Sequence, residues 1–206
     1  MIYDGDVDLE LAGEVMEYLE DEYWNITNAY RHAPQQPITL QLFPTRAFRE
    51  VTQSPDWVGG LYDGKIRVPL GGLDALTRRA KQVLSHELTH AVVHSKSRGN
   101  CPRWLHEGLA QMSESKRVTP KGRREIAERL ADRDAAQWDK EGFSYQMALS
   151  LTRHLESRRG FDTLVSLLDL LAEGAEIDAA LQHYYGEDYA AICRRWKREL
   201  TRKGGR

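Results

Sequence analysis

Cysteine is scarce in this sequence, which has only Cys101 and Cys193 in 206 residues. The two are far apart and form no Cys-x-x-Cys pair, so a zinc site built from thiolates is not expected. Whether they form a disulfide is left open, because spacing alone does not determine pairing. A chain of this length has enough residues to build a hydrophobic core.

Long apolar runs and an excess of one charge are also absent. No run of 18 apolar residues occurs, so we expect no transmembrane segment. The 29 basic and 31 acidic residues nearly balance, which excludes the strong positive charge typical of nucleic-acid-binding proteins. The locally basic stretch 194–206 is typical of a solvated helix end and a frayed tail.

The first ten residues contain no basic segment followed by an apolar one. They carry Asp4, Asp6, Asp8 and Glu10 instead, so we expect no signal peptide in this chain. Localisation stays open, since the chain could be a piece of a longer exported protein. The oligomeric state is open as well.

Periodicity in the first part of the chain predicts helices and a small sheet. Residues 7–32 have apolar residues at helical spacing, and residues 38–43 alternate as in a strand. Residues 57–70 predict a hairpin with a two-residue turn at Asp63-Gly64. Within it, Gly59-Gly60 indicates either a bulge or close backbone approach, or simple turn flexibility.

The rest of the chain is predicted to be helical. A short helix is expected over about 45–52, with Phe48 and Val51 facing inward, and a long one over about 73–95, with Asp74 near its N-cap. We therefore predict an α+β fold in a single domain, 1–206, with approximate subdomains 1–95 and 96–206. After a loop at 96–102, helices are expected at 103–112, 120–133, 144–158, 161–173, 176–184 and 187–202.

The most informative motif is His-Glu-x-x-His at residues 86–90, inside an apolar helical pattern. Residues four apart lie on the same face of a helix, so His86 and His90 can offer two imidazole nitrogens to one metal ion. Glu87 lies beside that face and can act on a water at the metal. This is the pattern of zinc peptidases, with two His ligands and a Glu as general base.

Catalytic zinc usually takes three protein ligands, so a third is needed. One class of these enzymes continues to a third His, but the corresponding positions here are Val93 and Lys96. The other common solution is a carboxylate from a following helix. Glu107, which lies 17 residues after His90, is at a suitable position.

Two segments together resemble a known family, the peptidase MA-like gluzincins. They are His86–His90 and the Trp-Leu-x-Glu-Gly-Leu-Ala stretch at 104–110, and weaker similarity occurs at 60–68 and 145–149. The resemblance implies a zincin-like fold with a small N-terminal mixed sheet, helices over the zinc helix, and a C-terminal helical subdomain. It also implies a zinc metallopeptidase acting on a peptide or protein.

The resemblance assigns a role to each site residue. His86, His90 and Glu107 would bind one Zn²⁺ ion, Glu87 would be the general base, and Tyr145 would stabilise the oxyanion. Three rival oxyanion donors remain open: His154, Tyr184 and Tyr185. Gln111 replaces an Asp that steadies a ligand His in thermolysin-type relatives, and Glu114 is an alternative support.

Three further readings stay open. His106 adjoins Glu107 and stays open as a ligand or substrate contact, whereas for His94 a structural role near the helix end is favoured over metal binding. Strand 66–70 could present an edge that binds an extended peptide by strand addition. The alternative to an enzyme is a catalytically silent module of the same fold that binds a peptide or protein.

Overall fold

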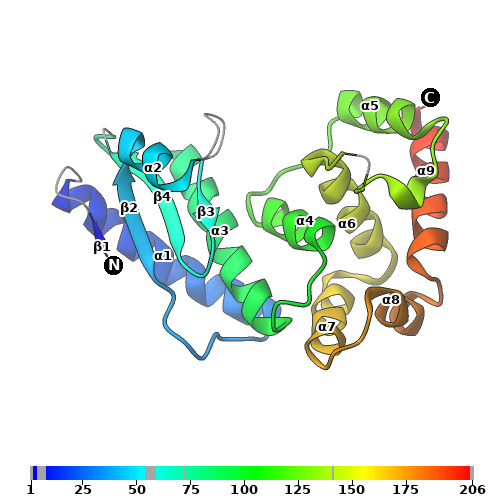
Figure 1. The fold of residues 1–206 in the computed structure, drawn as a ribbon, viewed down its shortest axis with the longest axis horizontal. Coiled ribbons are helices and arrows are strands. Elements are labelled where there is room, and N and C mark those ends of the chain that lie inside the picture. Colours follow the sequence, from blue (N-terminus) through cyan, green and yellow to red (C-terminus); the bar gives the residue numbers. More distant parts are fainter. Residues whose placement is uncertain (1, 4–7, 54–58, 72, 141, 205–206) are drawn as a thin grey trace. The chain divides into compact units, whose positions relative to one another are not determined.

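The computed structural model describes residues 2–3, 8–53, 59–71, 73–140 and 142–204. The chain divides into two compact units, residues 1–95 and 96–206. Helices dominate, and the strands among the described residues belong to one small sheet in the first unit (Figure 1). The predicted α+β class is confirmed, whereas a single peptidase domain with a zincin-like arrangement stays a prediction.

Helix α1 (Leu9–Tyr30) confirms the first predicted helix. The Asp8 carboxylate accepts a hydrogen bond from the Glu10 N–H at 2.8 Å and caps its N-terminus. Arg31, with a φ of 51°, ends the helix in the left-handed region. Its apolar stripe is buried as predicted at Leu11, Val15, Leu19, Ile26 and Tyr30.

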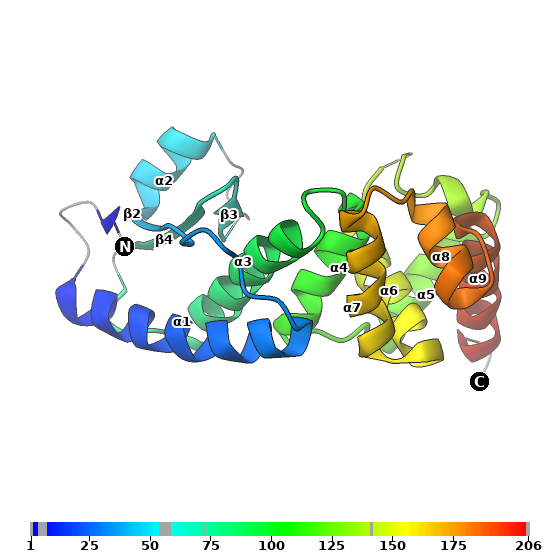
Figure 2. The ribbon, with the colours of Figure 1, turned by 90° about the horizontal axis from the view of Figure 1, so that it is seen from below.

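The sheet of the first unit is mixed, as predicted. Strands β1 (Ile2–Tyr3), β2 (Leu40–Pro44), β3 (Leu61–Tyr62) and β4 (Ile66–Gly71) lie in the order β1-β2-β4-β3. The β1–β2 and β2–β4 pairs are parallel, and the β3–β4 pair is antiparallel. In Figure 2, α2 lies on one side of the sheet and α1 and α3 lie on the other.

The predicted hairpin is present, but its turn is longer than expected. Tyr62 pairs with Ile66, so three residues rather than two connect β3 to β4. A two-residue turn at Asp63-Gly64 is therefore wrong, although Gly64 does take the positive φ of 92° that such a loop needs. Trp57 and Val58, also assigned to the hairpin, lie outside the described residues.

The possibility that strand 66–70 presents a free edge is ruled out at its first two residues and stays open for 68–70. β4 lies between β2 and β3, so Ile66 and Arg67 are paired on both sides. The outer strand on that side is the short β3.

Helix α2 (Thr45–Thr52) follows β2 directly, as predicted. Phe48 is buried and lies edge-on to Phe43 with ring centroids 6.3 Å apart. Val51, however, is 59% exposed, which contradicts its predicted inward position. Three positions along a helix leave Val51 only about 60° from Phe48, so this eight-residue helix buries just a narrow strip of its surface around Phe48.

Helix α3 (Arg78–Lys96) carries the His-Glu-x-x-His motif. It begins about five residues later than predicted, because residues before it bond elsewhere: the Leu73 N–H donates to the Leu70 carbonyl and the Leu76 N–H to the Glu14 carboxylate. Thr77 rather than Asp74 caps the helix, since its hydroxyl accepts from the Ala80 N–H at 3.2 Å.

One side of α3 packs against α1. The Tyr18 hydroxyl contacts the Ser85 hydroxyl at 2.6 Å and donates to the Lys81 carbonyl at 3.2 Å. Thr89 is fully buried one turn further and donates its hydroxyl hydrogen to the Ser85 carbonyl. These contacts hold α3 in a defined rotation about its own axis.

The second unit is helical, as predicted, and its helices end near the expected glycines. Gly160, Gly174 and Gly186 have φ values of 82°, 92° and 71°. Cys101 and Cys193 are both free thiols. The elements are α4 (Arg103–Ser113), α5 (Pro120–Leu130), the short 3-10 helix η1 (Ala135–Gln137), α6 (Tyr145–Arg159), α7 (Phe161–Ala172), α8 (Ile177–Tyr185) and α9 (Tyr189–Gly204).

Gly108 lets α4 approach α6 at backbone distance. A Cβ at this position would lie 2.7 Å from the Thr152 Cβ and 2.8 Å from the Ala148 carbonyl oxygen, closer than real Cβ atoms pack. The glycine next to Glu107 therefore has a packing reason. Trp104, Leu105, Leu109 and Ala110 are also buried, so the apolar part of this segment belongs to the core.

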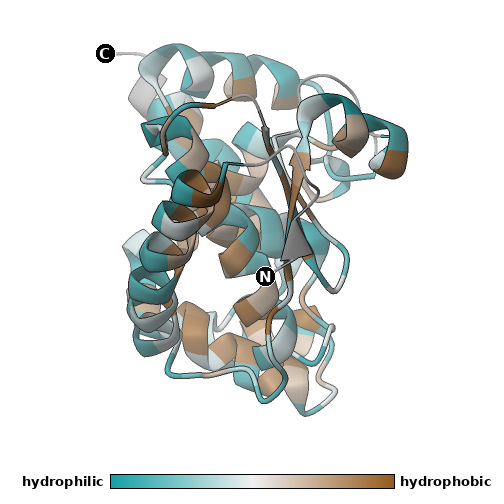
Figure 3. Cartoon of the chain, turned by 90° about the vertical axis from the view of Figure 1, so that its left-hand side faces the viewer, coloured by the Kyte–Doolittle hydropathy of each residue, from teal (hydrophilic) through white to brown (hydrophobic). Residues whose placement is uncertain are grey.

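Hydrophobic and hydrophilic residues are interleaved along the helices (Figure 3), as expected for amphipathic helices that bury one face. Among the residues that the structure describes, no helix combines the length and apolar character needed to cross a membrane.

Candidate active site

The two histidines of the motif converge on α3. The Nε2 atoms of His86 and His90 are 3.1 Å apart, and their rings meet edge to face with centroids separated by 4.6 Å. Two ligand nitrogens on a tetrahedral zinc ion, each about 2.0–2.1 Å from the metal, would be separated by about 3.3 Å. The pair therefore fits two ligand positions of one zinc ion.

The same separation also suits a hydrogen bond between two neutral imidazoles, one donating its N–H to the other. A metal-binding pair and a hydrogen-bonded pair thus share this geometry. Measuring bound metal distinguishes them.

Glu87, the predicted general base, is buried, with 5% of its surface exposed. The residues before β3 lie against it. A Cβ on Gly60 would be only 2.8 Å from the Glu87 Oε1 atom and 2.9 Å from its Cγ atom. Gly59-Gly60 is therefore a close backbone approach, one of the two alternatives left open by the sequence, and it leaves room for this carboxylate.

Tyr62 was not predicted as a site residue. Its ring lies edge-on to that of His94, one turn after His90 on α3, with centroids 5.9 Å apart. Burial raises the pKa of Tyr62, and the negative charge of Asp63 raises it further. This contact gives His94 a packing role, which is consistent with the structural role favoured for it.

Glu107 lies on α4, in the second unit, at a half-buried position. Gln111, one turn later, donates one amide N–H to the Glu107 carbonyl at 3.1 Å and the other to the Tyr145 carbonyl at 2.8 Å. Both amide hydrogens of Gln111 are thus used to join α4 to the start of α6. Only its oxygen is left to accept a ring N–H, so its role toward a ligand His stays a prediction.

Glu114, the alternative support, is buried and its carboxylate lies 2.7 Å from the Lys116 ammonium. A carboxylate engaged in this ion pair is held at the C-terminal end of α4.

Tyr145, the predicted oxyanion donor, is the first residue of α6 and is 37% exposed. Its ring contacts Phe143 edge to face at 5.3 Å. Two of its rivals are buried inside the second unit. His154 is buried with its Nδ1 atom 3.3 Å from a Glu199 carboxylate oxygen, and Tyr185 is buried beneath the Arg158 guanidinium.

Burial shifts the pKa of both rivals in the direction that favours the uncharged form. Desolvation lowers the pKa of the His154 imidazole, although Glu199 opposes it, and desolvation raises the pKa of the Tyr185 phenol. The third rival, Tyr184, is half-buried and contacts the His183 ring.

The predicted site residues therefore come from both units. His86, Glu87 and His90 share one helix of residues 1–95, whereas Glu107 and Tyr145 lie on two bonded helices of residues 96–206. Sequence reasoning missed the Tyr62 contact, which no local pattern signals. Comparison of the chain with models of protein families, with curated proteins and with solved structures found no match.

Proposed function

We propose that this chain is a zinc-dependent metallopeptidase of the gluzincin type that hydrolyses a peptide bond in a peptide or protein. The observation that carries the proposal is the convergence of the His86 and His90 Nε2 atoms, 3.1 Å apart, on the helix that also holds the buried carboxylate of Glu87. Two imidazoles with an adjacent glutamate are what hydrolytic zinc chemistry needs.

Glu107 is the proposed third ligand. His86, His90 and Glu107 each offer one ligand atom, two ring nitrogens and a carboxylate oxygen. Only residues 97–102 connect α3 to α4. Six residues span at most about 20 Å, so this short connection is compatible with Glu107 binding the same metal ion as the His pair. One carboxylate among three ligands leaves the ion with a net positive charge.

In this mechanism, bound zinc would supply Lewis acidity that polarises the scissile carbonyl and acidifies water. Glu87 would accept a proton from the attacking water and later deliver it to the leaving amine. Burial excludes bulk water from this carboxylate, and the backbone at Gly60 limits where it can move. Tyr145 is proposed to donate its phenolic hydrogen to the oxyanion.

Metal analysis and peptide hydrolysis together test the proposal. We expect about one zinc ion per chain in protein prepared with zinc, and cleavage of a fluorogenic peptide library that a chelator abolishes and added zinc restores. Absence of bound zinc, or hydrolysis that withstands chelation, would contradict it. Zinc binding without cleavage of any peptide would favour the silent binding module.

Replacing Gly60 by Ala should lower hydrolysis at least about 10-fold while zinc binding stays intact. The added methyl group would occupy space next to the Glu87 Oε1 atom, and a displacement of about 1 Å of a catalytic group can cost up to about 100-fold in rate. The measurement is kcat on a fluorogenic peptide beside zinc content by elemental analysis.

Gly59→Ala is the matched control. A Cβ on Gly59 would meet the Val83 side chain, with its nearest atom at 3.0 Å, and would have no atom of Glu87 within 4 Å. If G59A and G60A lose activity equally, Gly60 has no special role in placing Glu87.

A further inference from the structure

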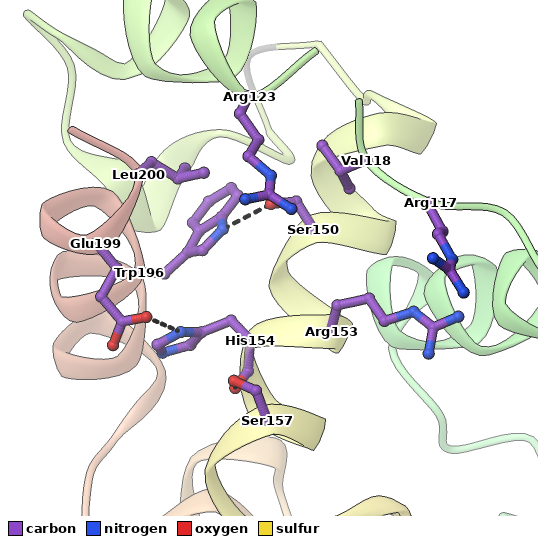
Figure 4. Close-up of a pocket in the computed structure, with 10 residues that line it drawn as sticks. All are labelled: Arg117, Val118, Arg123, Ser150, Arg153, His154, Ser157, Trp196, Glu199 and Leu200. Atoms are coloured by element: carbon purple, nitrogen blue, oxygen red, sulfur yellow. Dashed lines mark hydrogen bonds and ion pairs between the residues drawn. The ribbon is translucent and has the colours of Figure 1, made fainter. Parts of the chain in front are cut away.

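The second unit contains a pocket that none of the proposed site residues lines. It encloses about 460 Å³ and lies among α5, α6, α9 and the chain before α5 (Figure 4). This volume is within the range of small-molecule sites. We call it the arginine pocket, after the side chains that define it: Arg117, Arg123, Arg153, Ser150, His154 and Trp196.

Positive charge dominates its lining. Three guanidinium groups line it, against a single carboxylate, that of Glu199. Arg153 is paired with Glu156 at 2.9 Å, but within the described part of the chain neither Arg117 nor Arg123 has an acidic partner. Figure 4 shows Arg123 extending from α5 toward Ser150 and Trp196. Two cationic groups are therefore available to a ligand.

A buried ring nitrogen is a second, independent feature of this pocket. His154 is 6% exposed, and its Nδ1 atom faces Glu199 at 3.3 Å. Its Nε2 atom is buried and has no hydrogen-bond partner among the described residues. Buried polar atoms are nearly always bonded to protein, water or ligand, and with Nδ1 donating to Glu199 this nitrogen can accept a hydrogen bond from a water or from a donor group of a ligand.

An apolar wall completes the lining. Trp196 is buried, with its indole N–H donated to the Ser150 hydroxyl at 3.0 Å, and Val118 and Leu200 lie beside it. The indole N–H is thus already satisfied, which leaves its carbon atoms for apolar contact. A ligand here would meet cationic donors on one part of its surface and carbon on another.

We propose that the arginine pocket binds a small organic molecule that carries a phosphate or carboxylate group on an apolar body. The planar fork of a guanidinium matches both oxyanions through paired N–H donors. The whole site lies within residues 96–206, so it does not depend on the zinc-peptidase proposal. It would be a second ligand site on the chain.

Calorimetric titration of the full chain at about 0.15 M salt tests the proposal, because this ionic strength screens loose surface attraction. The probes are phenyl phosphate, benzoate and the uncharged benzyl alcohol. We expect saturable binding of at least one anion and none of benzyl alcohol. The stronger of the two anions identifies the oxyanion that the site prefers.

Variants inside and outside the pocket test where the anion binds. Arg123→Ala and Arg117→Ala should each weaken binding of the preferred anion about 10-fold or more. This is the usual loss of affinity when a charged hydrogen bond is removed. Arg124→Ala is the matched control, since Arg124 is the exposed neighbour of Arg123 on α5 and does not line the pocket. Circular dichroism checks that each variant folds.

Three results would overturn the proposal: no saturable binding of either anion, equal binding of benzyl alcohol, or equal losses in R123A and R124A. Binding should also survive chelation of zinc. A failed zinc-peptidase test and a failed pocket test are therefore distinguishable.

Discussion

Replacing Glu87 by Gln is expected to lower peptide hydrolysis by about 10²–10⁴-fold while zinc stays bound. The amide keeps the size of the carboxylate, so the contact with the chain at Gly60 is preserved. It cannot accept a proton from water, so only general-base catalysis is removed. Glu87 is not a proposed ligand, and the His pair is left unchanged.

The measurement is kcat/KM on a fluorogenic peptide with zinc content determined on the same sample. Glu17→Gln, an exposed carboxylate on α1 of the same unit, removes the same charge away from the motif and should leave the rate unchanged. If E87Q keeps full activity, Glu87 is not the base and the proposed mechanism is wrong.

Replacing His90 by Ala is expected to remove zinc from the protein. His90 is buried beside His86, and their Nε2 atoms are close enough to share one ion. Removing a residue that only hydrogen-bonds to a metal ligand weakens metal affinity about 10–100-fold. Removing a ligand itself should weaken zinc affinity by more than this. Zinc affinity by competition with a chelating dye measures the effect, and hydrolysis should fall with it.

His94→Ala is the control for this variant. His94 lies on the same helix one turn later, but its ring packs against Tyr62. H94A should keep zinc but lose some stability with the Tyr62 contact, which a melting curve records. Equal zinc loss in H90A and H94A would contradict a specific role for His90.

Glu107→Gln belongs to the same experiment, because it tests the third ligand alone. Gln keeps the side-chain volume, while the Gln111 bonds to the Glu107 and Tyr145 backbones do not involve the carboxylate. The packing of α4 on α6 should therefore survive. A fall in zinc affinity like that of H90A supports Glu107 as the third ligand. An unchanged affinity would require a different third ligand.

Local patterns predicted most of the elements. The helix expected from residue 120 begins there, and the Thr119 hydroxyl caps it by accepting from the Gly122 N–H at 3.0 Å. A long-range bond caused one of the errors. The start of α3 was misplaced because Leu76 bonds to Glu14, a residue 62 positions earlier that no local pattern can reveal.

The His-Glu-x-x-His helix and its i, i+4 pair were determined by the sequence alone, because helical spacing brings residues four apart onto one face. Tertiary structure decided what surrounds them. The close approach of Gly60 to Glu87, the Gln111 bonds that join α4 to α6, and the arginine pocket all depend on residues from different elements. Such contacts are decided by packing of distant segments, which periodicity along the chain does not encode.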